Sequence, residues 1–479
     1  MKPIVKTGPN GLSNQDGSVL RIFLYVFAAL FLLVIFAVGW VVWGPYHQPK
    51  GYSSPVVKAA RLEDKARLIR AQGDPADSTE LNAWYKTPSG QNSAMAYGQY
   101  LEVVRGMPSP MKGSPVPFLG RGDMPVPGES MSRNMSDAIE EYLADYSDIL
   151  NELMALEPVI ARGRYPADLS RGFEAQLPHI GGLRKLHQVL CLRALATGEK
   201  GLNADSTRAL LHAAALSESI ASEPIMVSQL QRASSGAVML STLEFLLNQE
   251  AAHGQDKEHE QGKWLGILAA KLPGLESHDD VLARVLVGER AALLGVANLP
   301  PERVAQLFGN GDFNDGQSTG IYARSKMIRK DIRFLIDAYD QYVNLARQGF
   351  PAATVLIPLM DERSEEARKN RYFLAAQTLV KGPIVGKLIT DVAQTRLIQA
   401  ALATERYRLD HSGRPPEKLE ALVPNYLAKS PLDPFTGKVL AYYRSDDNYS
   451  IEYSGKLFRD HGRTRTSIQI RYSAPVKAR

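Results

Sequence analysis

The uncharged, apolar segment Ile22 to Trp43 limits most strongly what this sequence can fold into. As a helix rising about 1.5 Å per residue, the run extends about 33 Å, close to the roughly 30 Å of a bilayer's hydrocarbon core. Trp40 and Trp43 suit the membrane interface, and Gly44-Pro45 ends the helix because proline lacks a backbone donor. We therefore expect a transmembrane helix over Ile22 to Trp43, with the lipid bilayer as its partner.

A cleaved signal peptide is the main alternative for this run. Its apolar region would be about 7–15 residues long and would end in a small-x-small site, and the run meets neither condition. The basic residues on the two sides of the run are balanced: Lys2, Lys6 and Arg21 before it, and Lys50, Lys58 and Arg61 after it. Orientation therefore rests on the short tail 1–21, and we expect a single-pass inner-membrane protein with a cytoplasmic tail and a periplasmic body.

The composition is that of a globular protein with room for several domains. The chain has 479 residues, of which 22% are charged and 44% hydrophobic. Its one cysteine, Cys191, lies in a leucine-rich helical pattern, so we expect a buried core residue and no intrachain disulfide. A net charge of +5 does not indicate a nucleic-acid partner, although the last 24 residues hold seven basic residues against Asp460 alone.

Downstream of the anchor, the chain divides by composition. Residues 44–105 read as a juxtamembrane helical segment, with helices over Val56 to Arg70 and Ser93 to Arg105. Residues 106–135 are rich in proline and glycine, which suit neither a helix nor a sheet, and predict a linker or a lid. Residues 136–383 predict an all-helical body, either an irregular bundle or a repeat-like array.

The helices of this body are predicted from apolar spacing and from breakers. Ser136 is placed to cap a helix through Ile139 and Leu153, and Ser277-x-x-Asp280 has the spacing of a capping box. The other helices are expected over Leu183 to Thr197, Ser206 to Ser222, Ile225 to Asn248, Gly262 to Leu272, Asp279 to Val296, Ala323 to Arg347 and Ser364 to Val380.

No motif in the sequence predicts a metal site or a catalytic centre. His253, Glu258, His259 and Glu260 match no zincin spacing, so we read them as a solvated loop. The segment Asn310 to Gly316 lacks the glycine and glutamate positions of an EF-hand, and His179, His187 and His212 show no shared partner. Nucleophile-elbow, phosphate-loop and dinucleotide motifs are also absent, so we expect no catalytic, cofactor or metal residues.

The last part, 384–479, predicts a small α+β module. A helix carrying Tyr407 should end at Gly413, and a short helix carries Leu419 and Leu422. The sequence Asp433-Pro434-Phe435-Thr436-Gly437 predicts a structural turn, because the aspartate can accept from backbone amides, the proline presets φ and the glycine permits positive φ. Antiparallel strands are expected over Leu440 to Tyr443, Tyr449 to Tyr453 and Thr466 to Tyr472.

This C-terminal order of motifs resembles the globular domain of type II secretion major pseudopilins. The matching residues are Tyr407, Asp410, Gly413, Pro416, Leu419, Leu422, Tyr426, Leu427, Pro431, Asp433, Pro434, Phe435 and Gly437. The prepilin signature of that family is replaced by Gly17-Ser18-Val19-Leu20-Arg21, and its calcium loop keeps one plausible ligand, Asp460. As a whole, the chain is similar to uncharacterised bacterial membrane-anchored helical proteins that end in such a module, through 177–186 and 223–230.

These features lead to a functional hypothesis and two alternatives. We expect a membrane-anchored, extracytoplasmic interaction or scaffold protein, without enzymatic activity, whose partner is a protein or an anionic envelope polymer. The C-terminal resemblance supports an alternative, an accessory component of a type II secretion or pilus-like machine. A second alternative is an envelope-modifying hydrolase with its active site in a cleft between helices.

Overall fold

The computed structural model describes residues 55–471 except 200, 254–257, 275, 298, 301–302, 305–306, 308–326, 446–447 and 456–466. The chain divides into two compact units, Met1–Lys65 and Ala66–Arg479. The predicted membrane helix Ile22 to Trp43 lies outside the described residues. Within the described part, no helix has both the length and the apolar character needed to cross a bilayer.

The described part is mainly helical, with a three-stranded antiparallel sheet near the C-terminus, as the sequence predicts. The α-helices are α2 (Pro55–Ala71), α3 (Ser78–Trp84), α4 (Ser93–Gly106), α5 (Arg133–Ala144), α6 (Ser147–Ala155), α7 (His179–Thr197), α8 (Ala204–Ser219), α9 (Met226–His253), α10 (Glu258–Lys271), α11 (Val281–Val296), α14 (Met327–Ala346), α15 (Leu356–Lys369), α16 (Phe373–Thr378) and α17 (Gly382–Asp410). The short 3₁₀ helices are η2 (Leu169–Glu174), η4 (Ala352–Val355) and η5 (Leu419–Leu422), and the strands are β1 (Ala441–Ser445), β2 (Asn448–Glu452) and β3 (Ser467–Ile470).

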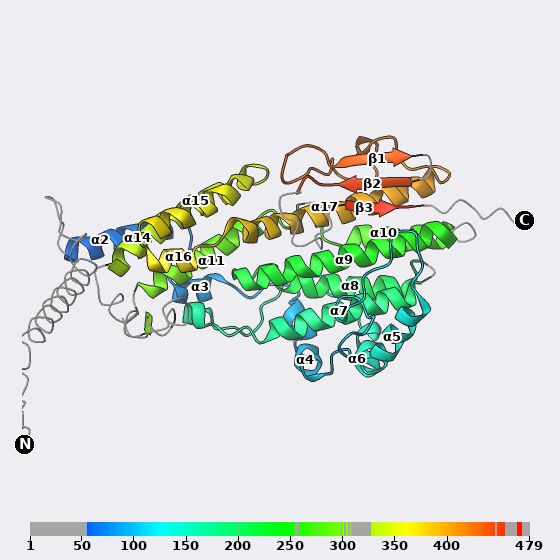
Figure 1. Ribbon diagram of the computed structural model, residues 1–479, viewed down its shortest axis with the longest axis horizontal. Helices are drawn as coiled ribbons and strands as arrows, with labels where there is room; N and C mark the ends of the chain where they lie inside the picture. Colours follow the sequence, from blue (N-terminus) through cyan, green and yellow to red (C-terminus); the bar gives the residue numbers. More distant parts are fainter. Residues whose placement is uncertain are drawn as a thin grey trace, which may run out of the picture. The chain divides into compact units, whose positions relative to one another are not determined.

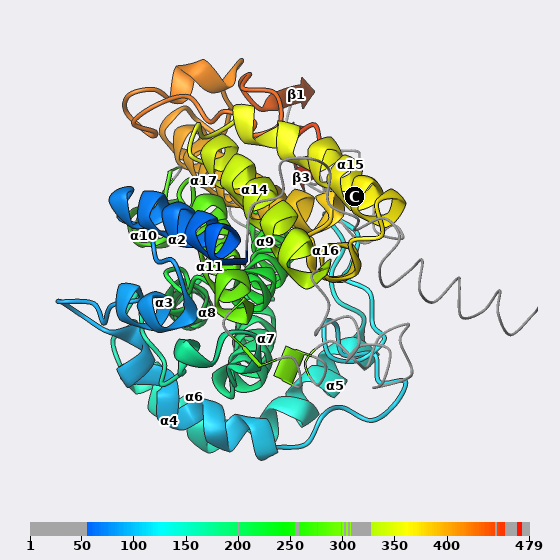
Figure 2. The same cartoon turned by 90° about the vertical axis from the view of Figure 1, so that its left-hand side faces the viewer.

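The second unit is built in layers around long helices (Figure 1). Helices α7, α8, α9 and α17 run side by side, and α10 packs on α17. The sheet covers α17 and α9 on one side of these helices, whereas α4, α5 and α6 cover α7 and α8 on the other. Figure 2 shows the same order from a perpendicular direction, with β1 on the side opposite α4.

One hydrophobic core runs through most of the second unit. It includes Leu101 of α4, Leu190 of α7, Leu246 of α9, Leu397 of α17 and Ile468 of β3, each no more than 3% exposed. The expected segments 106–135, 136–383 and 384–479 all contribute to this core. Burial of apolar surface therefore holds the sheet and the helices together as one body.

The proline- and glycine-rich segment 106–135 lies against this body. It forms no helix or strand before α5, in keeping with its composition, yet Val116 is fully buried. Backbone carbonyls of the segment accept hydrogen bonds from buried side chains: Pro108 O from Tyr146 (2.8 Å) and Phe118 O from Gln188 (3.2 Å). These bonds supply partners that regular secondary structure would otherwise provide.

The helix predicted from Ser136 through Leu153 is wrong in two respects. The capping side chain is Ser132, whose hydroxyl accepts from the amide of Met135 at 3.3 Å. The helix also breaks between α5 and α6 at Tyr146, where ψ is 6°. The buried hydroxyl of Tyr146 bonds to Pro108 O and to Tyr142. The apolar spacing in the sequence continues through this position, so it does not indicate the break.

The single helix predicted over Ser364 to Val380 is also wrong, because the chain forms α15 and α16 there. Arg371 adopts φ of 56° and ends α15 in the left-handed conformation that commonly closes helices. The Asp331 carboxylate of α14 then accepts from the amides of Leu374 and Ala375, both at 2.8 Å, and caps α16. A carboxylate distant in the chain therefore starts a separate helix.

The capping box predicted at Ser277 and Asp280 is wrong as well. Asp280 is the N-cap of α11, but its side chain makes no capping bond. It instead pairs with Arg284 at 2.7 Å and with Arg162 at 3.3 Å. The charged partners take the oxygens that a capping box would use.

The sheet has the order β1-β2-β3, with both pairs antiparallel. Tyr449 and Ile451 of β2 and Ile468 and Ile470 of β3 are buried, and they lie on the face that covers the helices. On the other face Tyr443 of β1 pairs with Ser450 of β2 and is 59% exposed. The alternation predicted from the sequence is thus the usual alternation of a sheet with one buried face.

Candidate functional site

The turn predicted at Asp433 is held by a buried carboxylate. Asp433 is 2% exposed and accepts from the amide of Phe435 at 2.9 Å and from the amide of Ser454 at 3.0 Å. The Thr436 hydroxyl donates to the same carboxylate at 3.1 Å. The side chain therefore fastens the turn to the end of β2 as well as to itself.

The remaining turn residues are architectural too. The Phe435 ring stacks on Tyr453 with 5.8 Å between ring centroids, and Pro434 is buried. Gly437 has φ of 70°, and a Cβ there would lie 3.0 Å from the Pro351 ring, so both conformation and space favour glycine. The described contacts of this turn therefore shape the fold.

The histidines considered in the sequence lie apart from one another. His179 Nε2 lies 3.0 Å from Glu223 Oε2, and both side chains are buried. Tyr97 OH lies 2.8 Å from His212 Nδ1. Burial lowers the pKa of His212 to about 4 and that of His187 to about 3. The last two therefore belong to the interior as neutral rings.

The solvated loop predicted for His253, Glu258, His259 and Glu260 is wrong, because His253 ends α9 and the other three begin α10. The side chains of these residues, and the segment Asn310 to Gly316, lie outside the described residues. Over the part of the chain that the structure does describe, no three histidine, cysteine or acidic side chains are grouped closely enough to hold a metal ion. Cys191 is fully buried, as expected, and burial raises the pKa of its thiol to about 12. Neither a metal nor a reactive thiol therefore marks a site within this part.

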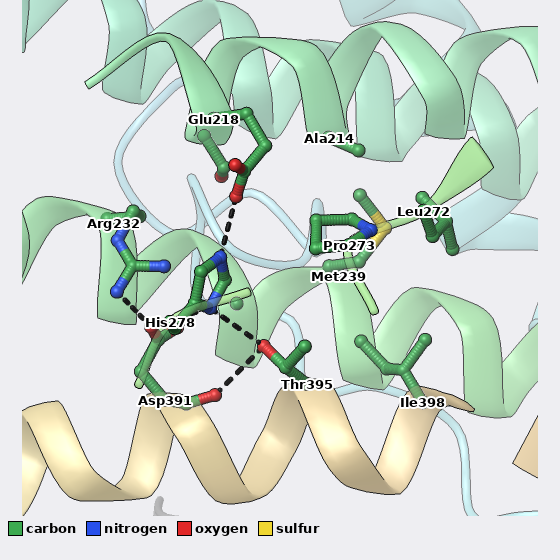
Figure 3. Close-up of a pocket in the computed structure, with 12 residues that line it drawn as sticks. Ala214, Glu218, Arg232, Met239, Leu272, Pro273, His278, Asp391, Thr395 and Ile398 are labelled. Atoms are coloured by element: carbon green, nitrogen blue, oxygen red, sulfur yellow. Dashed lines mark hydrogen bonds and ion pairs between the residues drawn. The ribbon is translucent and has the colours of Figure 1, made fainter. Parts of the chain in front are cut away.

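A pocket between α8, α9 and α17 gathers groups that the sequence did not bring together (Figure 3). Its cavity volume is about 50 Å³, and the cavity is partly open to solvent. The lining residues are Ala214, Ser217 and Glu218 of α8; Arg232, Gly236 and Met239 of α9; Leu272, Pro273 and His278 of the connection from α10 to α11; and Asp391, Thr395 and Ile398 of α17. Ionisable and apolar groups thus share one cavity.

His278 stands at the centre of the polar side chains. Its Nε2 lies 2.6 Å from Glu218 Oε1, and its Nδ1 lies 3.2 Å from the Thr395 hydroxyl and 3.5 Å from Asp391 Oδ2. Arg232 Nη2 approaches the same Asp391 oxygen at 2.7 Å. Two carboxylates, an imidazole and a guanidinium therefore form one connected cluster, defined here as Glu218, Arg232, His278 and Asp391.

The electrostatics of the cluster follow from this pairing. Burial alone would raise the pKa of Glu218, but the charge and hydrogen bond of His278, with smaller contributions from Arg232 and Arg162, lower it overall. Glu218 is therefore held as a carboxylate in an almost closed environment. Such a charged group is tolerated in the interior because it is paired and hydrogen-bonded.

The cluster has the ingredients of acid–base chemistry but no activated nucleophile. Both ring nitrogens of His278 face acceptors of the cluster. The hydroxyl that contacts the ring, and the candidate nucleophile for that reason, is that of Thr395. Thr395 in turn donates to the Asp391 backbone carbonyl at 3.1 Å within its own helix. The four ionisable side chains pair their charges with one another, which suits binding and helix association better than turnover.

A second feature is the difference between the two outer edges of the sheet. Along β3, Glu244 Oε1 of α9 accepts from the Gln469 amide, Asn248 Nδ2 donates to the Gln469 carbonyl, and Asn248 Oδ1 accepts from the Arg471 amide, all at 2.8 Å. Side chains of a helix thus take the place of a neighbouring strand. Along β1, no described backbone group bonds to the edge that faces away from β2.

Comparison with protein-family models, with curated proteins and with solved structures finds no match to this chain.

The sequence held only a weak signal for the pocket. Arg232 and Asp391 are charged residues within long apolar helices, and this is the pattern that a buried pair produces. Glu218 closes α8, and His278 lies in a short polar connection, so neither position indicates burial on its own. The pairing joins residues from distant parts of the chain and depends on the packing of α8, α9 and α17.

Proposed function

We propose that this chain is a membrane-anchored interaction protein that binds an extended segment of a partner protein along the free edge of β1. The observation that carries the proposal is the contrast between the two sheet edges. Glu244 and Asn248 close the β3 edge, whereas β1 leaves its outward backbone groups unpaired among the described residues. An added strand would supply these groups with the partners that they lack.

Open edges promote unwanted pairing, and proteins usually protect them. Here the protection at β3 uses two buried polar side chains, 3% and 1% exposed, whose placement depends on α9. No described residue gives the β1 edge such cover, and this edge carries the exposed ring of Tyr443 beside Arg444. A large aromatic side chain next to an open backbone edge offers packing as well as hydrogen bonds to an incoming strand.

The rest of the proposal comes from the sequence. Residues Ile22 to Trp43 would anchor the chain in the inner membrane, and the body with its sheet would lie in the periplasm. An accessory role in a type II secretion or pilus-like machine is compatible with strand addition and rests on the C-terminal resemblance. The hydrolase alternative has less support, because the ionisable groups of the pocket are paired with one another.

The test uses the full-length chain isolated from membranes after photo-crosslinking. A photoreactive amino acid at position 443 should link a protein partner, and the linked peptide should be a single extended segment. Tyr443→Lys should lower the recovery of that partner at least about tenfold, because a lysine on an edge strand opposes pairing. Tyr443→Phe keeps the ring and should bind as the wild type does, and Val355→Lys alters a comparably exposed site (54%) on η4.

Recovery of the same partner in equal amount from the Tyr443→Lys chain would overturn the proposal. So would a partner that Val355→Lys removes to the same extent, because the interaction would then depend on surface charge in general. A circular dichroism melt of each variant checks that the fold is retained.

A further inference from the structure

The pocket formed by α8, α9 and α17 has a polar end and an apolar end. The polar end holds the cluster Glu218, Arg232, His278 and Asp391 together with Ser217 and Thr395. The apolar end is lined by Ala214, Met239, Leu272, Pro273 and Ile398, which lie together on one side of the close-up (Figure 3). A molecule that fills it should therefore carry one polar group on a short hydrocarbon portion.

Hydrogen-bonding capacity remains at the polar end. Arg232 is 1% exposed, and within the described structure neither Nη1 nor Nη2 has a hydrogen-bond acceptor, although Nη2 forms an ion pair with Asp391 at 2.7 Å. The Ser217 hydroxyl, which also lines the pocket, has no hydrogen-bond partner within the same part of the chain. A buried N–H without an acceptor is costly, so a molecule that supplies an acceptor to Arg232 gains that free energy on binding.

The charges of the cluster decide what kind of acceptor fits. When His278 carries a proton on both nitrogens, two positive side chains face two negative ones and the cluster is neutral. When His278 is neutral, the cluster carries one negative charge. Neither state has the surplus positive charge that would compensate an incoming anion in this buried setting. A cation is also unsuitable, because an ammonium group has no lone pair for Arg232 Nη1.

Gly236 shows that this end of the pocket is closely fitted. A Cβ at this position of α9 would lie 2.6 Å from Asp391 Oδ1, so the carboxylate of α17 rests directly on the α9 backbone. Asp391 is thereby kept against Arg232 and His278, and its position is set by two helices. The polar end is a preformed arrangement, as expected of a binding site.

We propose that this pocket binds a small neutral amphipathic molecule whose hydroxyl or amide group accepts a hydrogen bond from Arg232 Nη1 and whose short hydrocarbon portion lies against Met239, Leu272 and Ile398. This site is separate from the β1 edge, and it does not depend on the function proposed above. It adds a ligand of defined chemistry to a protein whose sequence predicts none.

The probe set is n-butanol, butanoate and n-butylammonium, which share a hydrocarbon portion and differ in charge. The full-length chain in lipid nanodiscs, labelled with carbon-13 at the methionine methyl groups, is titrated with each compound. Met239 reports on the pocket, and Met239→Leu assigns its signal; Met95, which is 82% exposed, is the internal control. Ile398→Phe fills the apolar end, whereas Ile398→Val leaves it open.

We expect n-butanol to shift the Met239 signal saturably and to leave Met95 unchanged, with butanoate and n-butylammonium at least about tenfold weaker because each brings a charge into a buried site. Ile398→Phe should abolish the shift, and Ile398→Val should retain it. The proposal is overturned if the shift does not saturate, if a charged compound binds as well as n-butanol does, or if Ile398→Phe leaves the response unchanged. The comparison of the three compounds on the wild-type chain needs no variant, so it holds even where Ile398→Phe fails to fold.

Discussion

Replacement of Asp433 by alanine should loosen the C-terminal sheet more than any other single truncation in its turn. The carboxylate accepts three hydrogen bonds, two of them from the amides of Phe435 and Ser454, and is 2% exposed. A hydrogen bond to a charged group contributes about 1.5–3 kcal/mol, and the three are not additive because they share one acceptor group. We expect Asp433→Ala to cost about 3–5 kcal/mol, and Asp433→Asn, which keeps one acceptor oxygen, about 1–2 kcal/mol.

Hydrogen exchange on the full-length chain is the direct assay for Asp433. The amides of Phe435 and Ser454 should lose protection together, although one lies in the turn and the other after β2, because the same carboxylate holds both. Asp410→Ala is the matched control. Asp410 is an exposed carboxylate that accepts from Tyr426 OH at 2.7 Å, and this substitution should cost less than about 1 kcal/mol. If Asp433→Ala and Asp410→Ala cost the same, or if Ser454 keeps its protection, the carboxylate does not fasten the turn to the sheet.

Two further predictions concern the interior. Because burial lowers the pKa of His187 to about 3 from a usual 6.5, its stabilising contribution is complete above pH 6.5 and is lost as the pH falls, by about 1.4 kcal/mol per pH unit. In urea titrations below pH 6.5, the free energy of unfolding of His187→Met should fall less steeply with falling pH than that of the wild type. An unchanged dependence on pH would contradict the burial of a neutral His187. Arg232→Met leaves the buried Asp391 carboxylate without its guanidinium and should cost about 3–5 kcal/mol. Arg232→Met/Asp391→Leu should recover most of that loss in thermal unfolding, and a double variant as unstable as the sum of both single variants would show that the pair is not coupled.

The sequence predicts most of the helices correctly because their ends carry local signals. The helix that includes Cys191 ends at Gly198, and α9 follows Pro224, as the breakers indicate. The strands were also expected, because β-branched and aromatic residues alternate where one face is buried. The helix ends and the strands depend on residues that are neighbours in the chain, so they can be predicted from the sequence.

The sequence-based predictions fail where a residue distant in the chain determines the local structure. The break at Tyr146 depends on the Pro108 carbonyl, and the start of α16 depends on the Asp331 carboxylate of another helix. The polar cluster of the pocket forms only when α8, α9 and α17 pack together, and the spacing of residues within any one helix does not indicate this packing. Glu244 and Asn248 likewise look like ordinary helix residues until β3 lies against them.

Because α9 closes the edge of β3, the C-terminal part depends on the helical body for its stability. The strand is completed by side chains that lie more than 200 positions earlier in the chain, so a fragment beginning near Ile384 would carry two bare edges in place of one. Such a fragment would lose the Glu244 and Asn248 contacts together with the apolar face of α9, and its strands would be open to edge-to-edge aggregation. During synthesis α9 emerges before β3, the strand that it completes. The sheet therefore needs α9 to complete its β3 edge, and we expect it not to fold correctly when it is separated from α9.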